Sequence, residues 1–469
     1  MRRFVAATAA IVVGLSASLL LAQAPGPAAS QLARWLAVFN GEDRAARQQF
    51  YKEHWAYSPN QNFYEDLHDQ TGGFELLRVE ESTATRTVAL ARQADGDALS
   101  RLTFEVEAEA PHRVVRFTAQ PVPRPADLPI VRLTEAEVVK TIRDHLEGRA
   151  AADHFSGTVL IAKNGKAIFT AAYGLADRER KIPNRVDTRF KNGSMNKMFT
   201  AVATLALMQD SKLSLDDLLG KHLPDYPNAA VASKVNIHHL LTHTGGTGDI
   251  FGAAFNARRQ ELRTHQDYIA LLGTRGLAFE PGSQWSYSNY GFALLGAVID
   301  RASGRSYYDY VHDRVYVPAG MASTASEPED QVRPNSAIGY TKRAGSREWQ
   351  RNETTLPNRG MAAGGGYTTV EDLLRFANAI TGNRLLTPEN TRLLTTGKVK
   401  SGGGMYAYGF VDTTVNGVRA IGHSGGAPGQ TGDLLILPES GYVVAALANM
   451  DPPAAPRVSS FIASRLPAR

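Results

Sequence analysis

The chain contains no cysteine among its 469 residues. Disulfide bonds, thiolate metal sites and a cysteine nucleophile are therefore excluded. Neither sign of charge dominates, because 51 basic residues against 46 acidic ones give a formal net charge of +5. The basic residues are interleaved with acids, and no basic stripe with aromatic residues between them is present, so we expect no nucleic-acid partner. Internal repeats and low-complexity tracts are also lacking.

Beyond the N-terminus, no hydrophobic run is long enough to cross a bilayer. At the N-terminus, Arg2 and Arg3 precede an apolar run over residues 4–21, and Ala22–Gln23–Ala24 follows. This basic, apolar, small-residue order is typical of a secretory signal. We therefore expect residues 1–24 to be a signal peptide and the protein to be exported, periplasmic or secreted, with no stable membrane span after removal of the signal. The alternative is an uncleaved membrane anchor, since the run approaches spanning length.

What remains has the composition of a soluble globular protein, with 43% hydrophobic and 21% charged residues. The length suffices for two domains. Pro121, Pro123, Pro125 and Pro129 cluster with few apolar neighbours and indicate a linker over residues 123–132. We expect a domain boundary there.

Residues 31–122 predict a small α+β accessory domain. A helical face begins at Leu32, and a second amphipathic helix is expected over residues 44–54. Four strand-like segments follow, over residues 74–79, 85–92, 99–108 and 114–119. Helices followed by a curved antiparallel meander resemble the ketosteroid-isomerase-like fold. No convergent acids indicate catalysis here, so we expect a binding or packing role.

The segment 133–469 predicts an α/β (α+β) architecture. Thr134 and Glu137 form a capping-box pattern that opens a helix, and a hairpin joined by Asn164–Gly165 follows. A mainly helical region extends to about residue 400. Strands are expected again at residues 406–414, 418–422, 433–437 and 442–448. A final helix is expected at residues 454–466. Strands at both ends imply one antiparallel sheet flanked by helices plus an α-helical lobe, with a cleft between them.

Ser194 and Lys197 are a candidate catalytic pair. They open the apolar run Met198–Met208, whose helical spacing places Ser194 in the first turn of a buried helix. Positions i and i+3 share one face, about 5–6 Å apart at the Cβ atoms. A desolvated lysine loses its proton readily and can serve as the base that makes serine a nucleophile. The alternative is an ordinary serine beside a solvated lysine, and only partner residues can decide.

Tyr287 and Asn289 are candidate partners, on a loop just before an apolar helix. A tyrosine facing Ser194 could pass a proton to the leaving group, particularly if Lys197 lowers its pKa. Asn289 could bridge Lys197 and a substrate carbonyl, because its amide both donates and accepts. The similar Tyr226-Pro227-Asn228 lies in a proline-bearing loop, and we expect it to be structural.

A third candidate is His423-Ser424-Gly425-Gly426, at the end of a predicted strand. Glycines there let a substrate backbone lie close against the strand. The backbone N–H of Gly426, with that of Ser194, could form an oxyanion hole. The similar His243-Thr244-Gly245 indicates a helix end with glycine just past it, so His423 is preferred.

Three patterns in this order resemble the motifs of the penicillin-recognising serine hydrolases: Ser194-Met195-Asn196-Lys197, Tyr287-Ser288-Asn289 and His423-Ser424-Gly425. The chain is most similar to the class C β-lactamase relatives, and flanking segments such as Trp285–Gly291 agree. The resemblance covers the chain from about Leu133 to its end. It implies a β-lactamase/transpeptidase-like fold and an acyl-enzyme on Ser194.

One departure bears on the substrate. The β-lactamases of this branch carry Lys-Thr-Gly in the third motif, whereas this chain has His423, mostly neutral at pH 7 on a reference pKa of about 6.5. Relatives with histidine there include esterases and D-amino-acid peptidases. The resemblance therefore implies a carboxylesterase or D-amino-acid peptidase acting on a small-molecule ester, amide or D-aminoacyl substrate. The alternative is a β-lactamase, or an acylated sensor of β-lactams or wall fragments without efficient turnover.

The expected roles follow from this interpretation. Ser194, Lys197 and Tyr287 are the predicted catalytic residues. Substrate is expected to be bound by Asn289, His423, Gly425 and Gly426. We expect no cofactor and no metal, because the histidines at 238, 239 and 243 lack an interposed glutamate and an evident third ligand.

Overall fold

The computed structural model describes residues 26–469 except 42, 330, 332–333, 343–347 and 353–354. The expected signal peptide, residues 1–24, lies outside the described residues. The chain divides into two compact units, one ending at Ile130 and the other beginning at Val131. Within the described ranges, no helix is both long and apolar enough to cross a bilayer.

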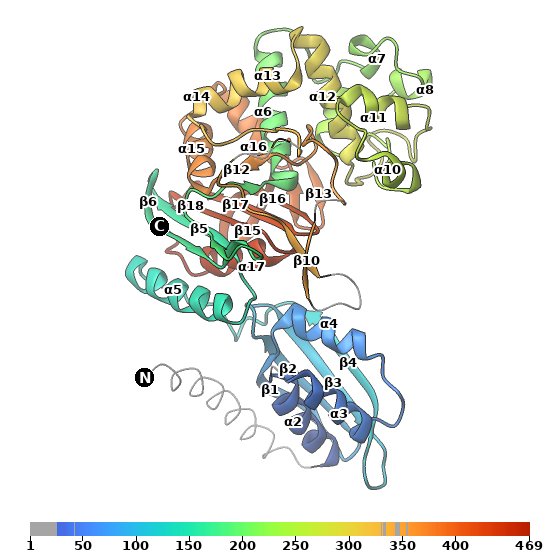
Figure 1. Cartoon of the computed structure of the whole chain (residues 1–469), viewed down its shortest axis with the longest axis vertical. Coiled ribbons are helices and arrows are strands. Elements are labelled where there is room, and N and C mark those ends of the chain that lie inside the picture. The colour runs from blue at the N-terminus through green and yellow to red at the C-terminus, as the bar shows by residue number, and fades with distance from the viewer. Residues whose placement is uncertain (1–25, 42, 330, 332–333, 343–347, 353–354) are drawn as a thin grey trace. The chain divides into compact units, whose positions relative to one another are not determined.

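In its described residues, the N-terminal unit contains three helices and a four-stranded antiparallel sheet of order β1-β2-β3-β4 (Figure 1). Its elements are α2 (Pro27–Phe39), α3 (Arg44–His54), α4 (Gln61–Thr71), β1 (Phe74–Ser82), β2 (Arg86–Gln93), β3 (Leu99–Val106) and β4 (Val114–Val122). The apolar face of α2 packs on the sheet, and the Trp35 ring lies 4.8 Å from that of Phe117. The α2 and α3 helices and the four strands occur close to the ranges that periodicity predicts.

The α4 helix was not predicted, because its buried face is largely polar. Its buried residues include Glu65, His68 and Thr71, so no apolar period marks it. Glu65 is buried in an ion pair with Arg47, at 2.8 Å. A helix whose buried side chains are charged carries no hydrophobic signature in its sequence.

The C-terminal unit is built on an eight-stranded antiparallel sheet of order β13-β14-β15-β16-β17-β18-β5-β6. The strands are β5 (Gly157–Lys163), β6 (Lys166–Tyr173), β13 (Val399–Ser401), β14 (Gly404–Tyr406), β15 (Val411–Val415), β16 (Val418–Ala427), β17 (Gln430–Leu437) and β18 (Tyr442–Ala448). The early strand β5 pairs with the last strand β18, so segments from the two ends of this unit meet in one sheet, as predicted.

Helices cover both faces of this sheet. On one face, α5 (Glu135–Ala151) and α17 (Ala454–Ala463) share an apolar cluster with Val159 and Ile161. On the other face, α6 (Asn196–Gln209) and α15 (Val370–Thr381) pack with Leu160. Successive side chains of a strand point to opposite faces, which is why neighbouring β5 residues enter different layers. The α5 helix begins at the predicted capping box of Thr134 and Glu137.

The helical lobe lies beside the α6 face of the sheet (Figure 1). Its elements are α7 (Leu219–His222), α8 (Ala229–Ala232), α9 (Ile237–Leu241), α10 (Ala253–Arg258), α11 (His265–Leu272), α12 (Asn289–Ser303), α13 (Tyr307–Val311), the π-helical turn η2 (His312–Tyr316) and α14 (Val317–Ala319). The α12 helix packs against α6, α9 and α11. The predicted antiparallel sheet with flanking helices and a helical lobe is therefore confirmed.

The remaining elements are short. They are β7 (Leu175–Asp177), β8 (Ile182–Pro183), β9 (Phe190–Lys191), β10 (Tyr340–Lys342), β11 (Trp349–Arg351), β12 (Tyr367–Thr368), the 3₁₀ turn η1 (Gly193–Met195) and α16 (Pro388–Thr395). The β9 strand pairs with β12 immediately before η1.

Two predicted strands differ most from the structure. The expected strand 406–414 is divided into β14 and β15 by a turn in which Gly409 has φ 68°. The expected strand 418–422 continues as β16 to Ala427, because β17 pairs with it up to Gln430. Glycine is uncommon inside strands, so the glycines around His423 wrongly indicated a strand end.

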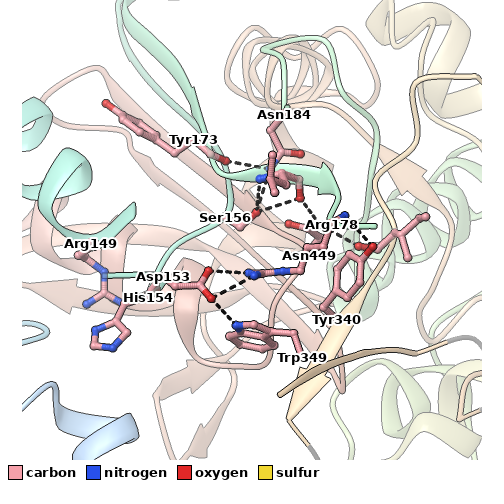
Figure 2. Close-up of polar contacts among 12 residues, drawn as sticks. Arg149, Asp153, His154, Ser156, Tyr173, Arg178, Asn184, Tyr340, Trp349 and Asn449 are labelled. Atoms are coloured by element: carbon pink, nitrogen blue, oxygen red, sulfur yellow. Dashed lines mark hydrogen bonds and ion pairs between the residues drawn. The ribbon is translucent and has the colours of Figure 1, made fainter. Parts of the chain in front are cut away.

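A polar cluster attaches the β10–β11 hairpin to the loops beside β5 (Figure 2). Asp153 accepts hydrogen bonds from both Nη atoms of Arg178, at 3.0 and 2.7 Å, and from Trp349 Nε1 at 2.6 Å. Tyr340 Oη accepts from the Arg178 backbone N–H at 2.8 Å. The cluster therefore holds the β10–β11 hairpin, which precedes residues 355–361 in the chain.

Candidate active site

Ser194 and Lys197 lie at the junction between η1 and α6. Ser194 occupies the 3₁₀ turn and α6 begins at Asn196, so the serine precedes the helix instead of lying within its first turn. The i, i+3 relationship is retained, and Lys197 Nζ lies 3.3 Å from Ser194 Oγ. Lys197 is fully buried, although a lysine is rarely so without compensation.

The surroundings of the Lys197 amine favour its neutral form. Burial lowers its pKa to about 7, and the charge of Asp249 opposes this shift. The Nζ atom donates to Asn289 Oδ1 at 2.8 Å and to the Ala363 carbonyl oxygen. A neutral amine has two N–H donors and one lone pair. With both donors engaged, the lone pair is left for the hydroxyl of Ser194.

Asn289 is fixed at the N-terminus of α12 by a residue that the sequence did not reveal. Asp249 accepts from the Asn289 backbone N–H at 2.8 Å and from its Nδ2 at 3.3 Å. The amide is thereby oriented with Oδ1 toward Lys197. No motif marks Asp249, since it lies 40 residues from its partner in a loop without recurring pattern.

Tyr287 lies two residues before Asn289 and reaches the same pair. Its side chain hydrogen-bonds with that of Ser194, and its ring centroid lies 4.7 Å from Lys197 Nζ. Burial raises the pKa of Tyr287 well above its ordinary value, and the bond to Ser194 only partly offsets this. The condition considered for the sequence, that Lys197 lowers this pKa, is therefore not met. Near neutral pH the phenol carries its proton and is a donor.

His423 is buried in β16, 7% exposed, behind the serine. Its Nε2 lies 3.1 Å from Tyr406 Oη, and its ring centroid lies 6.4 Å from that of Tyr287. Burial, followed by the charge of Lys197, lowers its pKa to about 4, so the imidazole is neutral. His423 does not line the cavity beside Ser194. Its direct contact with substrate stays a prediction.

Glycines allow β16 and η1 to approach closely. A Cβ atom on Gly425 would lie 2.2 Å from Asn192 O and 2.8 Å from Ser194 N. On Gly193, whose φ is 52°, it would lie 2.8 Å from Gly426 N. Both distances are far shorter than van der Waals contact, so neither position has room for a side chain. The segments that carry the backbone amides of Ser194 and Gly426 are therefore in close contact.

A cavity of about 210 Å³ opens beside Ser194. Of the predicted site residues, Ser194, Asn289 and Gly426 line it. Most of its other side chains are apolar, including Ile250, Phe251, Phe255, Leu356, Pro357 and Met361. Charged side chains also line it: Lys191, whose Nζ lies 2.9 Å from a carboxylate oxygen of Glu329, and Arg359. This volume suits a small substrate group, since pockets for drug-sized ligands hold about 300–1,000 Å³.

Two sequence patterns that resemble the site motifs, one at Tyr226 and one at His243, lie in different surroundings. Tyr226 is buried in the lobe, where its hydroxyl lies 3.1 Å from that of Tyr290. His243 follows the end of α9, as predicted, and its ring centroid also lies 4.4 Å from that of Tyr287. His239 Nδ1 accepts from Asn236 N at 3.3 Å, as part of a cap. In the part of the chain that the structure describes, no three His, Asp or Glu side chains are grouped to hold a metal ion.

The chain is similar to known proteins over most of its C-terminal unit. The Beta-lactamase family model matches residues 141–468. The chain is 30% identical to penicillin-binding protein 4* of Bacillus subtilis over 291 residues, 59% of this chain and 64% of that protein. The match therefore spans less than two thirds of that relative's length.

Two solved structures share the fold. A penicillin-binding protein from Bacillus halodurans has 32% identity and a TM-score of 0.62, over 68% of this chain and 99% of that one. A D-stereospecific amidohydrolase from Streptomyces sp. has 28% identity and a TM-score of 0.57, over 67% and 94%. The chain therefore belongs to the Beta-lactamase family, within the superfamily of serine hydrolases that includes the penicillin-binding proteins.

Proposed function

We propose that the protein cleaves an ester or amide bond of a small molecule through an acyl-enzyme on Ser194. The observation that carries this proposal is the environment of Lys197. Its two N–H donors are engaged by Asn289 and Ala363, and Ser194 Oγ lies 3.3 Å away on the remaining side. A base that is buried, neutral and aimed at a hydroxyl is what serine activation requires.

In the proposed acylation, Lys197 Nζ takes the proton of Ser194 as Oγ forms a bond to the substrate carbonyl carbon. The negative charge on the carbonyl oxygen is stabilised by hydrogen bonds from the amides of Ser194 and Gly426. Each such donor typically contributes about two to three orders of magnitude in rate. Tyr287 then gives its phenolic proton to the leaving oxygen or nitrogen as the carbon–heteroatom bond breaks. The Lys197 ammonium restores the proton of Tyr287.

In the proposed deacylation, water attacks the acyl carbon and the ester bond to Ser194 breaks. The proton of the water passes to the Lys197–Tyr287 pair, and a proton returns to Ser194 Oγ. Neither step needs a proton donor or acceptor other than these side chains and the attacking water. The roles are proposals that rest on geometry and on the pKa directions of Lys197 and Tyr287.

The substrate class is supported by three observations. The cavity is small and mainly apolar, which suits a compact acyl group. His423 is neutral, so its position offers no cation for the carboxylate of a β-lactam drug. Similarity to a D-stereospecific amidohydrolase supports an amide or D-aminoacyl substrate. A small ester or D-aminoacyl amide therefore fits better than a β-lactam.

The test is a substrate profile of the purified protein with Ser194→Ala as its pair. We expect the wild type to hydrolyse a short-chain chromogenic ester or a D-aminoacyl amide with turnover. The folded Ser194→Ala variant should be at least about 10³-fold slower, as expected when a nucleophile is removed. Equal rates for the two proteins would rule out serine catalysis.

A second candidate is supported by the similarity to penicillin-binding proteins. In it, a β-lactam or wall fragment acylates Ser194 and is released slowly, so that the protein acts as a sensor. Exposure to penicillin followed by intact-mass measurement separates the two. A persistent adduct favours the sensor, and rapid turnover of nitrocefin favours a β-lactamase.

The proposal includes export to the periplasm or the medium, on the basis of residues 1–24. Expression of the full chain in a bacterial host and mass measurement of the product would test it. Export predicts a shortened product outside the cytoplasm. A full-length product in the membrane fraction would support the uncleaved anchor.

A further inference from the structure

His243 occupies the interior directly behind the tyrosine of the site. It follows α9, has a φ of 59° and is 1% exposed. Its ring centroid lies 4.4 Å from that of Tyr287 and 4.5 Å from that of Tyr406. It does not line the cavity beside Ser194.

His243 holds the backbone on both sides of Tyr287. Its carbonyl oxygen accepts from the backbone N–H of Ser286 at 3.0 Å. Its Nδ1 accepts from the backbone N–H of Ser288 at 3.1 Å. One residue thus accepts from the backbone N–H groups of the two residues that flank Tyr287, while its ring packs on the tyrosine ring.

These contacts fix the protonation state of the imidazole. Because Nδ1 accepts a hydrogen bond, the single proton of the neutral ring is on Nε2. That atom is buried, and no described atom lies in hydrogen-bonding position to it. Burial lowers the pKa of His243 well below its ordinary value, and the charges of Lys197 and His423 act in the same direction.

An unpaired buried N–H destabilises the folded protein, because the group loses its hydrogen bond to water. A phenyl ring would fill the same space without that cost, but it could not accept from Ser288. The imidazole therefore contributes the acceptor at Nδ1, at the expense of an unpaired Nε2. This points to a requirement on the position of the Tyr287 loop and not to packing alone.

We propose that His243 is a positioning residue for Tyr287, which acts on the reaction by holding the phenol where it can protonate the leaving group. The inference rests on the proposed function, since it acts through the role given there to Tyr287. It assigns a part to a residue that the sequence pattern alone had set aside.

Two substitutions separate the two contributions of the side chain. His243→Asn retains a side-chain acceptor near the position of Nδ1, and asparagine tolerates a positive φ, but the ring is lost. His243→Phe retains the ring and loses the acceptor. His238→Phe is the matched control, because His238 lies in the preceding helix and pairs with Tyr408 Oη at 2.8 Å, away from Tyr287.

The decisive readout is the dependence of rate on the leaving group. The p-nitrophenolate group leaves an ester without a proton. The leaving group of an alkyl ester or an amide needs a proton from Tyr287. We expect His243→Phe to lower kcat about 10–100-fold on the alkyl ester, the range for displaced catalytic groups, with a several-fold smaller loss on the p-nitrophenyl ester. KM should change less than kcat. His243→Asn should lie between wild type and His243→Phe.

A double-mutant cycle with Tyr287→Phe completes the test. If His243 acts through Tyr287, its substitution should cost little once the phenol is gone, so the losses are not additive. All rates are normalised to active sites titrated by Ser194 acylation, which removes the effect of misfolded protein. His238→Phe should show the wild-type ratio between the two esters.

Two results would overturn the inference: equal losses of His243→Phe on both esters, or additive losses in the cycle. Neither affects the proposed function, which fails separately if Ser194→Ala keeps its activity. A dead Ser194→Ala with a wild-type leaving-group dependence in His243→Phe would leave the hydrolase standing and reject the role of His243.

Discussion

Asp249 accepts two hydrogen bonds from Asn289, one from its backbone N–H at 2.8 Å and one from its side-chain Nδ2 at 3.3 Å. This pairing determines which amide atom of Asn289 faces Lys197. The same carboxylate also acts on the lysine through space and raises its pKa against the effect of burial. Orientation and charge in the site thus depend on one acidic side chain outside the recognised motifs.

The first prediction concerns pH. Lys197 acts as a base only when deprotonated, and its pKa is about 7. We expect kcat/KM to rise with pH through about 7 and then to level off. In Asp249→Asn the raising effect of the carboxylate is lost, so the rise should move to lower pH while kcat falls, because Asn289 is less well held. A pH–rate profile measures both effects, with the exposed Asp187→Asn as control. A rise that stays in place or moves to higher pH would contradict the assignment.

The second prediction concerns the close approach of β16 and η1. In Gly425→Ala the added Cβ would lie 2.2 Å from Asn192 O, and the backbone must shift. We expect kcat to fall at least about 100-fold, since each oxyanion donor contributes about that much. Gly403→Ala is the control, because a Cβ there meets nothing within 4 Å. Steady-state kinetics at matched melting temperature decides, and near-normal kcat in Gly425→Ala would exclude the proposed oxyanion hole.

The third prediction concerns stability and pH. Asp433 is buried on β17 and accepts from Ser459 Oγ, and burial raises its pKa from about 3.8 to about 6. Between these values the folded state binds more protons than the unfolded state, so this group's contribution to stability falls as pH rises. The whole shift corresponds to about 3 kcal/mol at most.

In Asp433→Asn this dependence should vanish. We expect the variant to gain up to about 3 kcal/mol over the wild type between pH 4 and pH 7, measured by urea unfolding at both values. An unchanged difference between the two proteins across this window would show that Asp433 is ionised in the folded protein throughout.

The fourth prediction concerns the polar cluster that holds the β10–β11 hairpin. Arg178→Met removes both bonds to Asp153, which is itself about half exposed. We expect a loss of about 1 kcal/mol and a raised KM, because the hairpin leads into residues that line the cavity. Arg185→Met, in an exposed pair with Asp187, should change neither. Loss of stability without any change in KM would confine the cluster to a structural role.

Much of the fold could be predicted because its signals are local. The Thr134 capping box, the Asn164–Gly165 turn and the alternation in the strands each depend on a few neighbouring residues. The α4 helix was missed because its buried face holds Glu65 and His68, which carry no apolar period. Polar burial is set by tertiary partners, and single-sequence patterns do not contain it.

The residues of the candidate site also fall into those that local sequence patterns predict and those that they do not. Ser194 and Lys197 could be paired from their spacing, and Tyr287 and Asn289 from a short motif. Asp249 and His243 could not be predicted as site residues, because each is linked to the site by hydrogen bonds to residues 40 or more positions away in the sequence. The raised pKa of Tyr287 also could not be predicted, because it is caused by burial. The burial of a particular tyrosine side chain depends on the tertiary structure and cannot be read from the sequence alone.

The central claim is that Ser194 carries the acyl group. The most direct measurement is rapid acid quench of the protein during turnover of a slow ester, followed by intact-mass and peptide mapping. We predict a mass increase equal to the acyl group on the peptide that contains Ser194, appearing before product and absent in Ser194→Ala. Product formation by the wild type with no adduct at any time, or an adduct on another residue, would contradict the account.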